Sequence, residues 1–431
     1  MEQIIKRYVN PARSEWPVLV ERRLSDDGII AERTAAIIDK VRVGGDEAIR
    51  EIVRTIDGVE LNALEVTEEE RREAFALVPQ ELKDAIAKAV RNITVFHMAQ
   101  RFEPVETETV RGVLCVQRAV PMQRVGLYVP GGTAPLFSTV LMLAIPAKVA
   151  GCKEIILCTP ANSGGKVAPA VLFASMVCGV DRVFKVGGAQ AIAAMAYSTE
   201  TIPSVDKIFG PGNRYVTKAK EMVSNRVAID MPAGPSEVLV MADEMAIPSF
   251  VASDLLSQAE HGVDSQAILV CSNEDIADAV CAEVATQLQQ LPRKDMAAKA
   301  LENSRVVILT NPDERIEFVN MYAPEHLIIS TKDPWGISAR ITAAGSVFIG
   351  NYSPESAGDY ASGTNHTLPT SGWARSHSGV NLDSFVRKIT YQEITPEGMR
   401  SLGDTIVTMA KAEGLDAHAN AALLRMKSVT D

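Results

Sequence analysis

The pattern of apolar and polar positions divides the chain into three parts. Residues 1–110 mainly show the helical period: residues 67–70 form a capping box that opens one helix, and Pro79 separates it from a second helix that ends near Arg101. A segment rich in β-forming residues follows at 109–116. The first quarter of the chain is therefore predicted to be helical, with a strand at its end.

From about Val125 onward, short apolar runs alternate with helical stretches, which is the pattern of parallel strands joined by crossover helices. More of these units occur than one open sheet comfortably holds. The sequence predicts an α/β fold with two doubly wound, Rossmann-like domains and small helical N- and C-terminal appendages. The expected strands are 125–129, 154–158, 182–186, 207–209, 237–241, 266–271, 305–309, 327–330 and 346–349.

A long polar stretch, 351–378, follows the last expected strand and is rich in Gly, Ser, Pro and Asn. A structureless stretch of this length in a compact protein is usually functional or disordered, and the presence of Asp359 and His366 favours a function. The end of the chain is helical again. Thr395 is the expected N-cap of one helix, which Gly414 closes, and a last helix follows.

Composition narrows the classes of partner. Hydrophobic residues make up 47% of the chain and the formal net charge is −11, which argues against nucleic acids and anionic membranes as partners. No apolar run is long enough to span a bilayer, and residues 1–7 lack the apolar core of a secretory signal, so we expect a cytoplasmic protein. The six cysteines form no C-x-x-C pair and are expected to pack in the core.

One candidate site lies at the end of an expected helix over 248–262. Gln258 and His261 are three positions apart, so their side chains share one face of the last turn and could hold two corners of a metal site. The alternative is a helix-terminal His that bonds nearby carbonyls. Spacing alone favours this alternative, because Gln is not a common zinc ligand.

A second candidate is the pair Glu325 and His326, directly before an apolar strand. Open α/β sheets place their ligands at strand mouths, and a carboxylate beside an imidazole supplies two proton acceptors near neutral pH. An ordinary cap or surface pair explains the two residues equally well on sequence alone.

The third candidate is the loop 353–366, where small residues let the backbone fold tightly around Asp359 and His366. A Gly/Ser-rich surface turn is the alternative, but the density of polar groups favours a site. Glu413 and His418 flank a sharp turn between helices, which on its own predicts only a helix connection.

Glycine-rich turns follow several expected strands, at 130–132, 187–190 and 210–213. Each could bring backbone amides to a phosphate at the start of a helix, but none is a complete G-x-G-x-x-G fingerprint. Two further histidines, His97 and His377, have only structural interpretations, on a helix face and in a loop.

These segments together, in this order, resemble the histidinol dehydrogenase family. The resemblance covers nearly the whole chain, including the turn of Glu413 and His418. It rests on Tyr-Val-Pro-Gly-Gly (128–132), Val-Gly-Gly-Ala-Gln-Ala-Ile (186–192), Ile-Phe-Gly-Pro-Gly-Asn (208–213), Asp-Met-Pro-Ala-Gly-Pro-Ser-Glu (230–237), Ser-Gln-Ala-Glu-His-Gly (257–262), Ala-Pro-Glu-His-Leu (323–327) and Ser-Ala-Gly-Asp-Tyr-Ala-Ser-Gly-Thr-Asn-His (356–366).

The resemblance implies a zinc site, a substrate pocket and an NAD site. The zinc ligands would be nitrogen and oxygen donors without thiolate, a set compatible with zinc though not unique to it: Gln258, His261, Asp359 and His418. The substrate pocket would comprise these four with Ser236, His326 and Glu413, and with His366 nearby. The residues that match NAD-contacting positions are Tyr128, Gln190 and Asn213.

The activity implied is oxidation of L-histidinol through L-histidinal to L-histidine with two NAD⁺, the last steps of histidine biosynthesis. His326 would remove the alcohol proton, and Glu325 would activate the water that attacks the enclosed aldehyde. The rival functions are a zinc hydrolase acting on a small amide and a non-catalytic protein, either a metal-binding scaffold or a regulator that senses a histidine-like ligand. Another amino alcohol is a rival substrate.

The resemblance also implies a homodimer whose C-terminal segments cross, so that Glu413 and His418 complete the partner's site. The corresponding division of the chain is a helical arm at 1–22, a first α/β domain at 23–127 plus 237–380 carrying most of the zinc and catalytic residues, a second, NAD-contacting α/β domain at 128–236, and a C-terminal helical segment at 381–431 that reaches the partner subunit.

Overall fold

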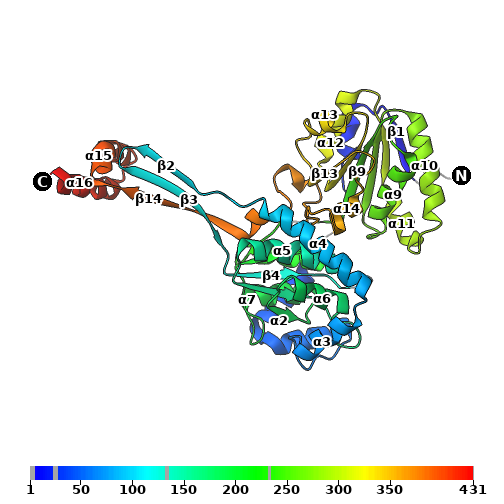
Figure 1. Cartoon of the computed structure of the whole chain (residues 1–431), viewed down its shortest axis with the longest axis horizontal. Coiled ribbons are helices and arrows are strands. Elements are labelled where there is room, and N and C mark those ends of the chain that lie inside the picture. The colour runs from blue at the N-terminus through cyan, green and yellow to red at the C-terminus, as the bar shows by residue number, and fades with distance from the viewer. Residues whose placement is uncertain (1–4, 23–27, 132–134, 232–233, 431) are drawn as a thin grey trace.

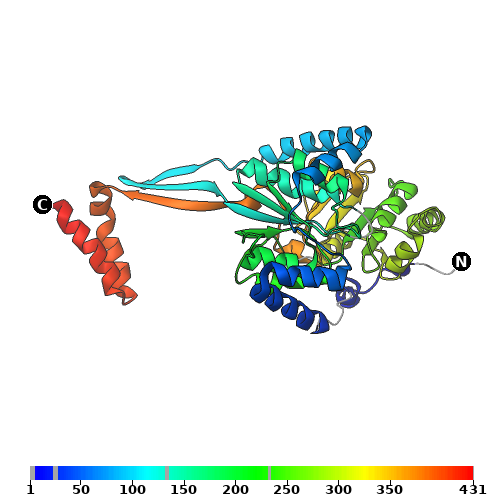
Figure 2. The same cartoon turned by 90° about the horizontal axis from the view of Figure 1, so that it is seen from below.

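The computed structural model describes residues 5–22, 28–131, 135–231 and 234–430. Gly132, Pro232 and Ala233, which belong to two of the motifs above, lie outside the described residues. Two α/β lobes lie side by side, and a long arm extends from one of them to the C-terminus (Figures 1 and 2).

One lobe contains a six-stranded sheet in which every neighbouring pair is parallel. Its central strands are buried on both faces, as expected for a sheet with helices on each side. In spatial order they are β1 (Lys6–Val9), β11 (Arg305–Ile308), β10 (Gln266–Cys271), β9 (Glu237–Ala242), β12 (His326–Ser330) and β13 (Ser346–Ile349). Its helices are α1 (Trp16–Leu19), α9 (Pro248–Ala259), α10 (Glu274–Leu288), α11 (Lys294–Leu301), α12 (Pro312–Tyr322), α13 (Pro334–Ser338) and α14 (Glu355–Tyr360).

The other lobe contains a five-stranded sheet, again parallel throughout. Its spatial order is β6 (Arg182–Phe184), β5 (Glu154–Cys158), β4 (Arg124–Tyr128), β7 (Lys207–Phe209) and β8 (Ala228–Ile229). One face packs against α3 (Glu68–Leu77), α4 (Gln80–Met98), α5 (Phe137–Ala150) and α6 (Pro169–Val177). The other face packs against α2 (Gly28–Ile52), α7 (Gly188–Tyr197) and α8 (Arg214–Val223). The prediction of two Rossmann-like α/β domains is confirmed.

The arm is an antiparallel three-stranded ribbon that ends in two helices (Figure 1). The strand β3 (Val113–Pro121) pairs with β2 (Val105–Val110) on one side and with β14 (Val386–Ile394) on the other. The helices α15 (Pro396–Ala412) and α16 (Asp416–Thr430) pack on each other at the tip of the arm.

The observed grouping of segments differs from the expected division in three places. Residues 28–98 cover the five-stranded sheet instead of joining the lobe of 237–380, because the apolar faces of α2, α3 and α4 pack against α5 to α8. The N-terminal arm contains β1, which pairs with β11. The C-terminal segment begins with β14, whose partner β3 lies far earlier in the chain.

The cysteines are all free, and four of them are buried as expected. Cys115 and Cys281 are instead partly exposed. Among the helices of the described residues, none combines the length and the apolar character that a bilayer crossing requires.

Candidate active site

The end of α9 supplies the first two candidate ligands. Gln258 lies in its last turn, but the helix ends at Ala259, so His261 lies just beyond it and not within the expected helix over 248–262. Pro248 starts the helix, which returns the chain from the carboxyl end of β9 to the amino end of β10. Gln258 is fully buried, yet neither polar atom of its amide has a hydrogen-bond partner among the described residues. Because an unpartnered buried amide is costly, this side chain calls for a ligand that is absent from the chain itself.

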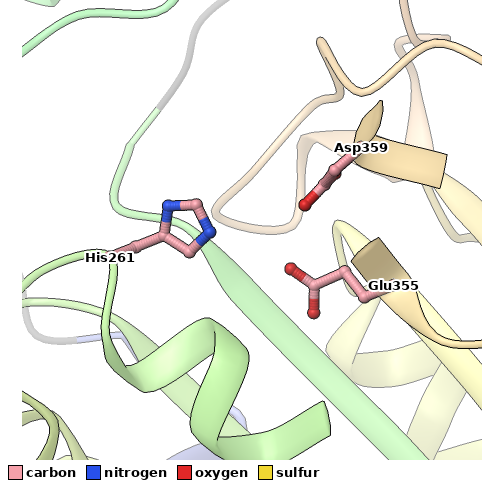
Figure 3. A group of neighbouring side chains, drawn as sticks. All are labelled: His261, Glu355 and Asp359. Carbon is pink, nitrogen blue, oxygen red and sulfur yellow. The ribbon is translucent and has the colours of Figure 1, made fainter. Parts of the chain in front are cut away.

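The short helix α14 brings two carboxyl groups to the same place. Glu355 and Asp359 are one turn apart, so they share a face of the helix. Together with His261 they offer three ligand atoms that all lie within 4.8 Å of one another. Figure 3 shows the three side chains pointing toward a common space. The sequence analysis did not single out Glu355, although its spacing of four from Asp359, directly after Pro354, could have indicated it.

The pair Glu325 and His326 reaches the site through a sharp turn at the end of α12. Ala323 caps that helix in the left-handed conformation, with φ of 51°, and Pro324 prevents the helix from continuing. The Oε2 atom of Glu325 accepts a hydrogen bond of 2.9 Å from the main-chain N–H of Glu237. The Nε2 atom of His326 lies 3.7 Å from Oδ1 of Asp359 and has no hydrogen-bond partner in the part of the chain that is described.

Burial dominates the electrostatics of this group. It raises the pKa of Glu325 and of Glu355, and it raises the pKa of Asp359 to about 7. Burial also lowers the pKa of His326 to about 3, so its ring is neutral near pH 7. Within the described residues, no Lys or Arg contributes to the three carboxyl shifts. A divalent cation would supply the missing positive charge, and the donors present fit one.

His366 connects this group to the other lobe. Its Nδ1 lies 3.0 Å from the main-chain oxygen of Asp359, and its Nε2 lies 3.3 Å from Oγ1 of Thr139 on α5. Burial lowers the pKa of His366 to about 4, which keeps this ring neutral as well. Ser236 lies directly before β9 and is partly exposed.

The three residues expected to contact NAD lie at the carboxyl edge of the five-stranded sheet. Tyr128 ends β4, and its buried hydroxyl accepts a 3.0 Å hydrogen bond from the N–H of Gly188 at the start of α7. Gln190 is buried in the first turn of α7, and Asn213 caps α8 by accepting from the N–H groups of Tyr215 and Val216.

The position of Glu325 and His326 differs from the expected strand mouth. They precede β12, and Gln258 lies near the end of a helix that leads to β10, so both belong to the amino edge of the six-stranded sheet. The contact between Thr139 and His366 brings this amino edge toward the carboxyl edge of the five-stranded sheet. The candidate site therefore lies between the two lobes.

Glu413 and His418 are not brought to this site within one chain. Both are exposed, and they flank the turn between α15 and α16 at the tip of the arm. Figure 1 shows this tip at the opposite end of the molecule from the six-stranded lobe. Of the four predicted zinc ligands, the structure thus brings His261 and Asp359 together, with Gln258 at the end of the adjoining helix, whereas His418 lies apart from them.

A family model described as histidinol dehydrogenase matches residues 20–426. The chain belongs to the histidinol dehydrogenase family. It is 58% identical to the histidinol dehydrogenase of Bacteroides fragilis strain YCH46 over 97% of this chain and 98% of that one. It is 56% identical to the histidinol dehydrogenase of Bacteroides thetaiotaomicron over 99% of this chain and 100% of that one.

The fold agrees with a solved member of the histidinol dehydrogenase family. The crystal structure of the enzyme from Elizabethkingia anophelis superposes with a TM-score of 0.98 at 48% identity and covers 100% of both chains. The chain thus has the fold of that solved enzyme over its whole length, and it is an oxidoreductase.

Proposed function

We propose that the protein oxidises L-histidinol through L-histidinal to L-histidine, the last steps of histidine biosynthesis, with one zinc ion per subunit and two NAD⁺, and that it acts in the cytoplasm. The observation that carries this proposal is the buried, unpartnered amide of Gln258 beside His261 and Asp359, next to the pair Glu325 and His326. These groups would supply a cation site and two proton acceptors at one place in the fold.

Gln258, His261 and Asp359 would hold the zinc ion together with His418 of the second subunit. When bound, zinc would anchor and orient the imidazole and amine of the substrate, and each NAD⁺ would accept one hydride. Tyr128, Gln190 and Asn213 would contact NAD⁺, because they lie where helix N-termini offer backbone amides to phosphates.

The side chains of this chain would perform the proton transfers. The free Nε2 of His326 would take the hydroxyl proton as the alcohol becomes an aldehyde. Glu325 would then take a proton from the water that adds to the aldehyde, and oxidation of the resulting hydrate gives the carboxylate. Ser236, Glu413 and His366 would bind the substrate around the reacting carbon. Burial of Glu325 and His326 would keep the aldehyde away from bulk water.

A homodimer would complete the site. The arm exposes large apolar side chains on its ribbon and its helices, among them Tyr391 at 45%, Met409 at 61% and Leu424 at 58%. An extended arm with this surface is unusual for an isolated chain and fits an exchange of arms between two copies. Such an exchange would carry Glu413 and His418 to the site of the partner.

The test measures how many molecules of NADH form for each L-histidinol consumed. Purified zinc-loaded protein is given a known amount of L-histidinol with excess NAD⁺, and NADH is followed by absorbance with and without a chelator. Two NADH for each histidinol, lost after chelation and restored by zinc, are expected. Absence of NADH from L-histidinol would contradict the proposal, and zinc-dependent cleavage of a small amide in its place would favour a hydrolase. One NADH per histidinol would contradict the second oxidation.

A further inference from the structure

Glu237 holds both members of the pair Glu325 and His326 through its main chain. Its N–H donates to Oε2 of Glu325 at 2.9 Å, and its carbonyl oxygen lies 3.2 Å from Nδ1 of His326. Glu237 is the first residue of β9, and β9 pairs with the strand that begins at His326. The orientation of the two proton acceptors therefore depends on where one residue begins its strand.

The bond to His326 also decides which nitrogen of the ring is free. A carbonyl oxygen only accepts, so Nδ1 of the neutral ring must carry the hydrogen. The Nε2 atom then keeps its lone pair, and it faces Asp359 without a hydrogen-bond partner among the described residues. A shift of Glu237 would release the ring and allow the other tautomer.

The side chain of Glu237 is in turn held by Arg22. The guanidinium makes two hydrogen bonds to the carboxylate, from Nε to Oε2 at 2.8 Å and from Nη2 to Oε1 at 3.0 Å. It also donates to the main-chain oxygen of Tyr322 at 2.7 Å and lies over the ring of that residue, 3.7 Å from its centre. The Glu237 side chain is 2% exposed and that of Arg22 is 15% exposed, so this is a buried ion pair.

The pair joins two places where the chain passes from one lobe to the other. Arg22 lies at the end of the segment that precedes α2, which belongs to the five-stranded lobe. Glu237 lies where the chain returns from β8 to the six-stranded sheet. The ion pair therefore links the two connections between the lobes, next to Glu325 and His326.

We propose that the Arg22–Glu237 ion pair is a positioning device that fixes the main chain of Glu237, and through it the orientation of Glu325 and the tautomer of His326. This role rests on the proposed function of the catalytic pair. Stability alone does not explain the arrangement, because a buried ion pair can often be replaced by apolar residues of similar size without loss of stability.

The test compares two double variants that each replace a two-pronged Arg–Glu pair by methionines. The first is Arg22→Met/Glu237→Met. The control is Arg182→Met/Glu65→Met in the five-stranded lobe, a pair with two similar hydrogen bonds of 3.0 and 2.7 Å but with side chains 33% and 36% exposed. Zinc-loaded proteins are compared for thermal midpoint, and for kcat and KM with L-histidinol.

The first variant is expected to keep a thermal midpoint near that of the wild type while kcat falls between about tenfold and a hundredfold, with KM changed less than about threefold. The control is expected to keep both kcat and KM. Unchanged kcat in the first variant, or an equal loss in both variants, would overturn the proposal. If the first variant does not fold, Glu237→Gln, which keeps the shape and the main chain, carries the same test with a smaller loss of kcat.

These outcomes are separate from the proposed function. The wild type is assayed first, and a wild type that forms no NADH from L-histidinol refutes the proposed function. An active wild type together with a fully active Arg22→Met/Glu237→Met variant refutes only the positioning role.

Discussion

The two parallel sheets contribute opposite edges to the candidate site, and the edges differ in charge. At the amino edge of the six-stranded sheet, α9 and α12 end, and helix C-termini carry a partial negative charge. At the carboxyl edge of the five-stranded sheet, α7 and α8 begin, and helix N-termini carry a partial positive charge. The first edge suits a cation and the second suits the phosphates of a dinucleotide.

The two edges also differ in how many of their expected binding residues one chain places there. Tyr128, Gln190 and Asn213 all lie on one lobe of one chain. At the cation edge lie His261 and Asp359, with Gln258 on the adjoining helix, whereas His418 lies in α16 at the tip of the arm. Changes in the arm should therefore affect metal binding but not NAD⁺ binding, and changes at the dinucleotide edge should affect NAD⁺ binding but not metal binding.

The largest expected effect comes from His418→Asn. We expect zinc content to fall and activity to drop at least about a hundredfold, because a direct ligand is lost. Because His418 is exposed, the free energy of unfolding of the metal-free protein should change by less than about 0.5 kcal/mol. Metal analysis, NADH formation and thermal unfolding measure the three quantities.

The control for this variant is His377→Asn, which makes the same chemical change in a loop where the ring contacts Trp373 and Ser376. It should keep its zinc and its activity. Full zinc occupancy in His418→Asn would contradict the assignment of the fourth ligand.

A smaller and more selective effect is expected from Glu325→Gln. The amide can still accept the hydrogen bond from the Glu237 N–H, so the geometry is kept while the proton acceptor is lost. The overall reaction should slow by about a hundredfold or more, whereas the first oxidation should be less affected, since only the second needs activated water. In single turnovers, the first NADH formed from L-histidinol is compared with the NADH formed from L-histidinal. Equal losses in these two phases would count against this role.

The smallest expected effect concerns the dinucleotide edge. Gly210 has φ of 126°, and a Cβ there would meet the Tyr128 carbonyl oxygen at 2.0 Å. Its N–H donates to Asp230 at 2.7 Å and its oxygen accepts from Lys220 at 2.9 Å, so the turn cannot easily move. Gly210→Ala should raise the KM for NAD⁺ and cost roughly 1–3 kcal/mol of stability, with zinc content unchanged.

Gly58→Ala is the matched control, because Gly58 also has a positive φ, 68°, but a Cβ there would meet nothing within 4 Å. It should cost about 1 kcal/mol and leave the KM for NAD⁺ unchanged. A loss of zinc in Gly210→Ala would show that the two edges are not independent.

Much of the fold follows from local pattern. The expected strands at 154–158, 207–209, 266–271 and 346–349 coincide with β5, β7, β10 and β13, because buried parallel strands are apolar runs with clear ends. The strands β1 and β14 were missed, since an edge strand and an exposed ribbon lack such a run. The placement of α2, α3 and α4 was missed because sequence period shows which helix face is apolar but not which sheet it covers.

Local sequence pattern predicts less of the candidate site than of the fold. Spacing placed Gln258 and His261 on one helical turn, but nothing local links them to Asp359 about a hundred residues later. Only the resemblance to a known family grouped these residues as expected ligands of one zinc ion. The spacing of Glu355 from Asp359 could have indicated it, whereas the contact between Arg22 and Glu237 depends on tertiary packing and emerged from the structure alone.

The most direct test of the shared site is complementation between two inactive variants. Asp359→Asn removes a ligand from the lobes and His418→Asn removes one from the arm. Their subunits are unfolded together, refolded with zinc and assayed for NADH formation. If arms are exchanged, each mixed dimer has one intact site, and random mixing should restore about a quarter of wild-type activity. Mixing Asp359→Asn with Glu325→Gln, both in the lobes, should restore none. No recovery in the first mixture, with mixed dimers present, would contradict the account.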